Sequence, residues 1–171
     1  MRRHRLTPTD LHVPPMKRYP RTPPRLEWIF PDSPVFFITF CAYRRHRLLA
    51  NRAVHLAFQR FALSAYRDYN VAVERYVIMP DHIHLFVCGP DDFLLGRWIG
   101  ALKQALAKAI TNHSARSPIW QRGFFDHILR SNESYSEKWE YVRDNPKRAG
   151  LISNGEEWPY AGEIVAIEHD L

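Results

Sequence analysis

The alternation of apolar and polar positions along the chain predicts four β-strands. The run at 35–41 is rich in β-branched and aromatic side chains, which is typical of a buried strand, and the run at 124–129 is predicted to be the fourth strand. Two more, at 71–79 and 82–87, are separated by a Pro-Asp pair that favours a tight turn. Every predicted strand is short enough for a sheet of ordinary size.

Three segments are predicted to be helices. Apolar residues recur at helical spacing over 51–69 and over 95–110, so each of these segments has one face suited to a core. A third helix follows the fourth strand, where Ser131 or Ser134 can cap it, and Ser134 with Glu137 has the spacing of a capping box. The order of elements is the βαββαβ pattern of a ferredoxin-like antiparallel sheet with an added C-terminal helix. We therefore expect an α+β fold.

The chain divides into three parts by composition. Residues 1–33 are rich in proline and in basic side chains, and such a stretch cannot bury enough apolar area to fold alone. We expect it to be an extended arm, which could lie along a DNA backbone or be a solvated tail. The folded domain is predicted to span residues 34–161, and residues 162–171 form a C-terminal tail.

Composition and charge narrow the class of protein. A chain of 171 residues with 46% apolar side chains suits one globular domain. Its 24 Lys and Arg residues exceed the 18 acidic ones, and a net charge of +6 favours polyanionic partners such as nucleic acid. Two cysteines are too few for a disulfide framework, and no apolar run is long enough to span a membrane. We expect a cytoplasmic protein without a membrane partner.

The strand at 82–87 carries the candidate chemistry. His82 and His84 are two residues apart, so they share one face of the strand, while Ile83 and Leu85 share the other. The apolar face can be buried while the two imidazoles project together, in reach of one metal ion or one phosphate. Two surface histidines on a half-exposed sheet would give the same pattern, so the pair needs support from elsewhere in the chain.

The final helix offers that support. Tyr141 and Asn145 are four residues apart and share a helix face with Lys138. Pro146 cannot continue the helical hydrogen bonds, so the helix should end or kink there. Laid across the open face of the sheet, this helix would present a phenol, an amide and an ammonium to the imidazoles. Its packed face is predicted to carry Tyr135, Trp139 and Val142.

Basic residues that could contact DNA phosphates are found after the first strand, on the second helix and around the fourth strand and final helix. The candidates are Arg44, Arg45, Arg47, Arg97, Lys103, Lys108, Arg122, Arg130, Lys138 and Arg148. A solvated helix face would explain those on the second helix equally well. Asp126 and His127 could lie beside the site or simply belong to the end of a strand.

Four blocks of the sequence resemble the successive motifs of the single-tyrosine HUH transposases, which are IS200-like, and most of all the REP-associated tyrosine transposases. They are 76–87, 120–130, 141–151 and 158–161. The resemblance identifies residues 34–161 as an HUH single-tyrosine transposase domain. It implies a ferredoxin-like fold, a single-stranded DNA substrate with hairpins of repeated extragenic palindromes, and a divalent metal, Mg²⁺ or Mn²⁺.

The resemblance also implies roles for four residues. His82 and His84 match the metal ligands, Tyr141 matches the nucleophile, and Asn145 matches the amide that completes the metal site. The implied reaction is nicking and strand transfer through a 5′-phosphotyrosine intermediate. By ligand chemistry alone, imidazole would suit zinc, manganese or copper better than magnesium, so the resemblance and the ligand set disagree in part.

Two other classes remain as alternatives. A ferredoxin-like nucleic-acid-binding module without catalysis would stack bases on exposed strand aromatics, whereas this strand presents His82 and His84 with Phe86 beyond them. A zinc hydrolase would need a third histidine or a carboxylate at suitable spacing, which we do not find. The sequence leaves open whether the protein is a monomer or a homodimer and which hairpin it recognises.

Overall fold

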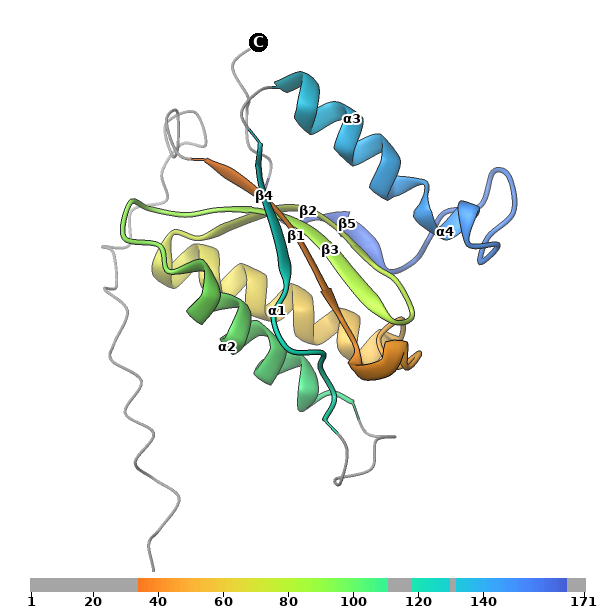
Figure 1. The fold of residues 1–171 in the computed structure, drawn as a ribbon, viewed down its shortest axis with the longest axis horizontal. Coiled ribbons are helices and arrows are strands. Elements are labelled where there is room, and N and C mark those ends of the chain that lie inside the picture. Colours follow the sequence, from red (N-terminus) through yellow and green to blue (C-terminus); the bar gives the residue numbers. More distant parts are fainter. Residues whose placement is uncertain (1–33, 111–117, 130–131, 166–171) are drawn as a thin grey trace, which may run out of the picture.

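The computed structural model describes residues 34–110, 118–129 and 132–165. Within these ranges the chain forms one five-stranded antiparallel sheet, in the order β4, β1, β3, β2, β5 (Figure 1). Every neighbouring pair of strands is antiparallel. The strands are β1 Val35–Cys41, β2 Ala72–Ile78, β3 His82–Cys88, β4 Phe125–Leu129 and β5 Ala161–Glu163.

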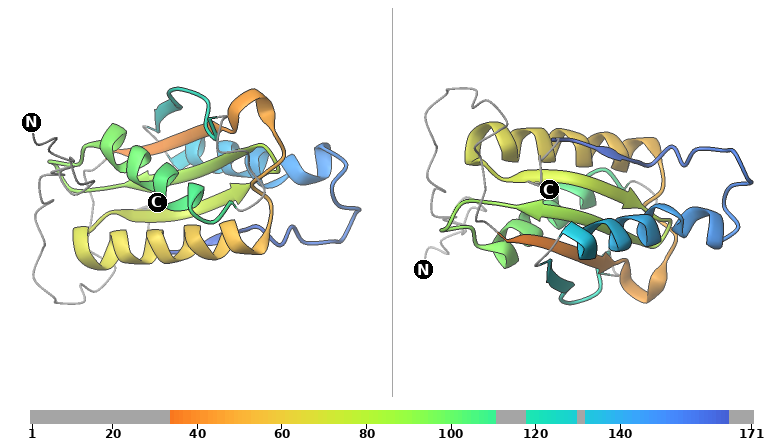
Figure 2. Two further views of the ribbon diagram at one scale, coloured as in Figure 1. Left: turned by 90° about the horizontal axis from the view of Figure 1, so that it is seen from below. Right: turned by 90° about the horizontal axis from the view of Figure 1, so that it is seen from above.

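Helices cover both faces of the sheet. The helices α1 and α2 pack on one face, and α3 crosses the other (Figure 2). They are α1 Arg52–Tyr69, α2 Leu95–Ala107, α3 Asn132–Arg143 and the short α4 Asn145–Arg148, with a 3₁₀ turn η2 at Tyr43–Arg45. The order of β1, α1, β2, β3, α2 and β4 and their places in the sheet confirm the predicted ferredoxin-like fold with a helix added after it.

The ends of α1 follow from local chemistry. The side chain of Asn51 accepts a hydrogen bond from the backbone N–H of Val54 at 3.1 Å, which satisfies one of the free donors at the start of the helix. At the other end Asn70 adopts a left-handed conformation with φ 55°, which asparagine tolerates better than most residues do. The chain then turns directly into β2.

The main core lies between the sheet and the pair of helices α1 and α2. Ile83, Leu85 and Val87 of β3 are fully buried there, as the alternation of the strand predicted. The opposite face of the sheet holds a second cluster under α3, which includes Phe37, Val77, Phe86, Tyr135 and Val142. The predicted packed face of the final helix is therefore confirmed.

An irregularity in β2 helps to fix α3 on the sheet. The register with β3 shifts between Val73 and Tyr76, as at a β-bulge. The guanidinium of Arg75 lies 5.6 Å from the ring centre of Tyr135 and 5.4 Å from that of Trp139. Its Nε is also 3.2 Å from Glu163 Oε2 on β5, so one side chain joins α3 to two strands.

The sequence patterns did not predict β5, which pairs with β2 and crosses the boundary drawn at residue 161. Several expectations lie outside the described residues: the arm at 1–33, Ser131 as a cap, Arg130, and the tail beyond residue 165. The side chain of Ser134 is not described either, although the residue lies within α3. No helix in the described ranges is long and apolar enough to cross a membrane.

Candidate active site

The two histidines of β3 project from the face of the sheet that α3 crosses. Their ring centres are 4.7 Å apart and the ring planes are nearly perpendicular. Both side chains are half-buried, and the ring of His84 stacks on Phe37 of β1 at 5.6 Å between centres. The predicted pairing of two imidazoles on one face, backed by a buried apolar face, is confirmed.

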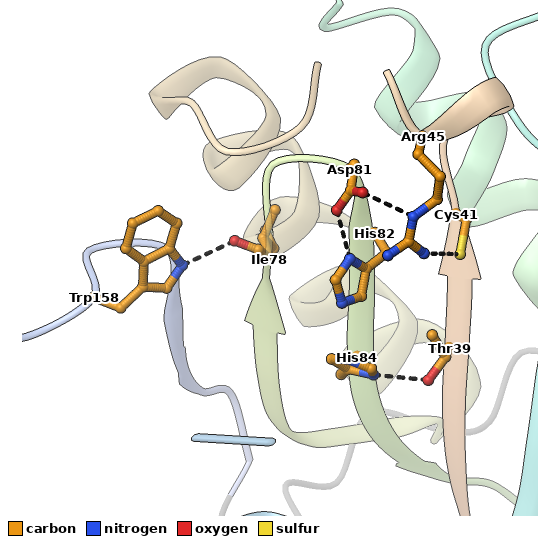
Figure 3. A network of polar contacts seen from close by, with 8 residues as sticks. All are labelled: Thr39, Cys41, Arg45, Ile78, Asp81, His82, His84 and Trp158. Atoms are coloured by element: carbon orange, nitrogen blue, oxygen red, sulfur yellow. Dashed lines mark hydrogen bonds and ion pairs between the residues drawn. The ribbon is translucent and has the colours of Figure 1, made fainter. Parts of the chain in front are cut away.

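Each imidazole is oriented by a polar neighbour (Figure 3). His82 Nδ1 lies 2.6 Å from Asp81 Oδ1, and His84 Nδ1 lies 2.7 Å from Thr39 Oγ1. A carboxylate only accepts hydrogen bonds, so His82 Nδ1 carries the proton and its Nε2 keeps a lone pair. With the same tautomer at His84, donating to Thr39, both Nε2 atoms are free to bind an ion.

Asp81 is itself held in place. Arg45 Nε lies 2.8 Å from Asp81 Oδ2, and the guanidinium also donates to Cys41 Sγ at 2.9 Å (Figure 3). Burial alone would raise the pKa of Asp81, but the hydrogen bond from His82 and the charge of Arg45 outweigh it and lower that pKa. Asp81 is therefore ionised at neutral pH and acts as a fixed acceptor for His82.

The backbone before α1 is unusual at the residue that reaches Asp81. Arg44 and Arg45 have φ values of 50° and 58°, in the left-handed region that side chains other than glycine and asparagine seldom adopt. Such a conformation costs on the order of 1 kcal/mol per residue. Arg45, expected to contact DNA, instead directs its guanidinium toward Asp81, and we interpret it as a positioning residue.

His84 is kept neutral by its surroundings. Burial lowers its pKa to about 3, and the positive charges of Arg45 and Arg148, together with any proton gained by His82, act in the same direction against the charge of Asp81. A neutral imidazole is the form that coordinates a metal, so the site does not need to lose a proton before an ion binds. Burial also lowers the pKa of His82, although its bond to Asp81 opposes that effect.

Tyr141 and Asn145 stand on either side of a break between two helices. α3 ends at Arg143, and α4 begins at Asn145 with Pro146 in its first turn, which confirms the predicted end or kink. The spacing had suggested that the two residues share one helix face, but they lie in two separate helices. Tyr141 is 60% exposed, while Asn145 is half-buried.

Arg148 links this break to the histidines. Its guanidinium lies 3.7 Å from the centre of the Tyr141 ring and donates hydrogen bonds to the carbonyl of Tyr141 and to Asn145 Oδ1. The same positive charge is one of those that lower the pKa of His84. The junction of α3 and α4 thus lies on the side of the sheet to which the histidines point.

The fit of a metal ion can be judged from these donors. No group of three His, Cys, Asp or Glu side chains suited to an ion occurs in the described ranges, so His82 and His84 need a ligand of another type. The amide oxygen of Asn145 is the remaining candidate, and it accepts a hydrogen bond from Arg148, which would have to share or release that oxygen for an ion to bind. Two neutral imidazoles and one amide oxygen fit a divalent cation while leaving positions open for phosphate oxygens.

The other predicted DNA contacts are spread over the molecule. Arg44 and Arg47 are exposed between β1 and α1, and Arg122 is exposed before β4. Those on α2 lie on the far face of the sheet from the histidines. There Lys103 Nζ donates to the carbonyls of Gln121 at 3.2 Å and Gly123 at 2.6 Å, which gives it a structural role.

Further members of the predicted set remain available at the surface. Arg97 of α2 and Lys108, which directly follows that helix, are exposed. Lys138 of α3 lies on the histidine side, with its Nζ 5.4 Å from the ring centre of Phe37. Asp126 is opposite Ile38, a residue of the main core, and therefore faces away from the histidines, whereas His127 is opposite Phe37 and shares their face.

Comparison with known proteins shows which family the chain belongs to. The model of the family described as "Transposase IS200 like" matches residues 35–145. This chain belongs to that family. The transposase is 25% identical over 128 residues to the REP-associated tyrosine transposase of Escherichia coli K12, covering 74% of this chain and 73% of that one.

Two further relatives of the transposase are informative. A protein of Haemophilus influenzae named as a putative REP-associated tyrosine transposase is 30% identical over 96 residues, which is 49% of this chain and 54% of that one. The solved structure of a REP-associated tyrosine transposase bound to a REP hairpin superposes with a TM-score of 0.62 at 22% identity, covering 75% of each chain. The transposase therefore shares the fold of this solved protein.

The sequence analysis missed three positioning side chains in this site. Thr39 gave no signal, because nothing in β1 indicates that it lies beside a residue 45 positions away. Asp81 was assigned only to a turn, although its place directly before His82 could have suggested an orienting carboxylate. Arg45 was grouped with the basic residues that could contact DNA. Its pairing with Asp81 could not be foreseen, because it depends on an irregular backbone.

Proposed function

We propose that this transposase nicks and rejoins single-stranded DNA, with Tyr141 as the nucleophile. The observation that carries the proposal is the position of Arg148, which contacts both Tyr141 and Asn145 at the α3–α4 junction, on the face of the sheet from which His82 and His84 project. This arrangement supports the proposal that the phenol, the amide and the imidazoles act in one site. Tyr141 is 60% exposed, so a DNA strand can reach its hydroxyl.

In the proposed reaction the phenol oxygen of Tyr141 loses its proton and attacks the scissile phosphorus. The bond from phosphorus to the 3′ oxygen breaks, and that oxygen takes up a proton to become a free 3′-hydroxyl. The 5′ phosphate remains on the tyrosine as an aryl ester, which keeps the energy of the broken bond. A 3′-hydroxyl can later attack this ester, rejoin the strand and release the phenol.

We propose His82, His84 and Asn145 as the ligands of Mg²⁺ or Mn²⁺. A bound ion would polarise the scissile phosphate and stabilise the charge that develops in the transition state. The role of the chain is to hold both imidazoles in one tautomer through Asp81 and Thr39. Arg148 stands beside the same amide and can meet a phosphate oxygen of the bound strand.

We propose hairpins of repeated extragenic palindromes as the natural substrate. The relative from Escherichia coli is named for its association with REP sequences, and the solved relative is bound to a REP hairpin. The basic residues on the histidine side, Lys138 and Arg148, together with Arg44 and Arg47, could contact the phosphates of the single-stranded flank.

The state of the DNA tests this proposal. An oligonucleotide with a hairpin and single-stranded flanks should be cut in one flank, whereas the same flank paired with its complement should stay intact, because a duplex hides the bases and stiffens the backbone. Gel analysis of both substrates with Mn²⁺ gives the comparison. Equal cutting of the paired and unpaired flank would contradict the proposal.

Asp81 provides a test of the metal site that does not remove a ligand. Asp81→Asn keeps the size of the side chain but removes the charge that fixes His82 and pairs with Arg45. We expect the concentration of Mn²⁺ needed for half-maximal cleavage to rise about 10- to 100-fold, with cleavage recovering at high Mn²⁺.

The matched control is Asp126→Asn, since that exposed carboxylate faces away from the histidines. It should leave the dependence on Mn²⁺ unchanged. An unchanged dependence in Asp81→Asn as well would show that the carboxylate does not orient a metal ligand.

A further inference from the structure

The strand β4 is one edge of the sheet, and its side chains are unusually open. Phe125, Asp126, His127 and Ile128 are all exposed, and only Leu129 is buried. Edge strands are commonly protected by charged side chains, yet here a phenylalanine is 58% exposed. Among the residues that the structure describes, Phe125 and Tyr141 are the two Phe, Tyr or Trp side chains that are mostly exposed.

The register of the sheet places Phe125 in line with the histidine site. Phe125 is directly opposite Thr39 on β1, and Thr39 is directly opposite His84 on β3. Directly opposed residues project from the same face, so the three side chains form one row across the sheet. Thr39 is also hydrogen-bonded to His84. Two strand spacings separate Phe125 from His84, a distance of about 10 Å.

A cationic group lies in the adjacent row. His127 is opposite Phe37, and Phe37 is opposite Phe86. The ammonium of Lys138 lies 5.4 Å from the ring centre of Phe37. A positive charge therefore lies over the row beside that of the exposed Phe125 ring, on the same face as the imidazoles. Single-stranded DNA offers the matching chemistry, since it carries an unpaired base with a π face beside each phosphate.

We propose that Phe125 is the stacking residue for one unpaired nucleobase close to the scissile phosphate. This inference rests on the proposed function, because it assumes that the strand passes the histidine site. Stacking on the edge of the sheet holds the strand in register across β4 and β1, so that the neighbouring phosphate reaches the imidazoles. In a duplex that base is stacked between its own neighbours, so the subsite also selects for unpaired DNA.

The test is a binding experiment without cleavage. A hairpin oligonucleotide with single-stranded flanks is compared, in EDTA, with a series in which each flank nucleotide in turn is replaced by an abasic one. Loss of the stacked base should weaken binding by wild-type protein about 5- to 100-fold at one position. Phe125→Ala should weaken binding of the intact oligonucleotide by a similar factor and show no further loss at that position.

Two variants guard against an effect on folding. Ile128→Ala removes another exposed side chain of β4, but one opposite Phe36 on the other face of the sheet, and should bind as wild type does. Phe125→Trp keeps a stacking surface and should retain the affinity. Both comparisons separate the loss of an aromatic face from general damage to the edge strand.

Three results would overturn the proposal. Phe125→Ala could bind the intact oligonucleotide as tightly as the wild type, or it could lose the same further affinity at every abasic position. The third is a wild-type protein whose affinity is not reduced by an abasic nucleotide at any position. Because no cleavage is involved, the outcome stays readable even if Tyr141 proves not to be the nucleophile. Conversely, an adduct on Tyr141 together with a negative result at Phe125 would leave the proposed function intact.

Discussion

Tyr141→Phe is expected to abolish the covalent protein–DNA adduct while leaving DNA binding close to that of the wild type. The substitution removes one oxygen atom, the proposed attacking atom, and keeps the ring on which Arg148 lies. Because removal of a nucleophile leaves only background reaction, the rate of nicking should fall by at least about 10⁴-fold. Denaturing gel electrophoresis of protein mixed with labelled hairpin DNA and Mn²⁺ measures the adduct.

A matched control for Tyr141→Phe must be a tyrosine outside the site. Tyr135 is a poor choice, because it is buried and its hydroxyl interacts with the carboxylate of Glu74, so removing that hydroxyl would disturb the protein outside the site. Tyr69, at the end of α1 on the other face of the sheet, is half-buried and better suited. Tyr69→Phe should form the adduct normally.

Mass spectrometry of the trapped wild-type complex should find the nucleotide on the peptide that contains Tyr141. A nucleotide on another tyrosine, or full activity in Tyr141→Phe, would reject the assignment of the nucleophile. Retained DNA binding in that variant, combined with loss of the adduct, is the result that separates an enzyme from a passive binding module.

His84→Ala is expected to lower cleavage by more than about 100-fold, because it removes a proposed metal ligand and not only a residue that orients one. DNA binding should change little, since phosphate contacts supply most of the affinity. The stabilisation of the protein by Mn²⁺ in thermal unfolding should be lost as well, because an ion that no longer binds cannot favour the folded state.

The control for His84→Ala is His46→Ala, since His46 is exposed between β1 and α1. It should keep both cleavage and the Mn²⁺-dependent rise in melting temperature. If His84→Ala cleaves DNA normally, the metal site has been assigned to the wrong residues; if it cleaves slowly but is still stabilised by Mn²⁺, the ion binds elsewhere.

Local patterns in the sequence determined the elements and the faces of this protein. In β3 the strict alternation of residues decided that His82 and His84 share a face, because successive strand side chains point in opposite directions. In the final helix, Pro146 decided where helix geometry is interrupted, because its ring excludes the regular hydrogen bond. The order of the elements was enough to predict the ferredoxin-like fold.

Contacts between distant segments were decided only by the tertiary structure. Thr39 meets His84 because β1 and β3 pair in one particular register, and a shift by one residue would point Thr39 to the other face. Arg45 reaches Asp81 through a left-handed backbone that no periodic pattern indicates. The three residues of β5 carry too little pattern to predict a strand, and pairing with β2 makes them one.

The edge strand β4 most clearly separates what the sequence determines from what the tertiary structure decides. Its composition predicted a strand and left its exposure open, since aromatic and β-branched residues favour strands in general. Among the strands that the structure describes, β4 pairs with β1 alone, and four of its five side chains are exposed. Sequence determined that Phe125 lies in a strand; only the order of strands decided that this ring is open to solvent and in line with His84.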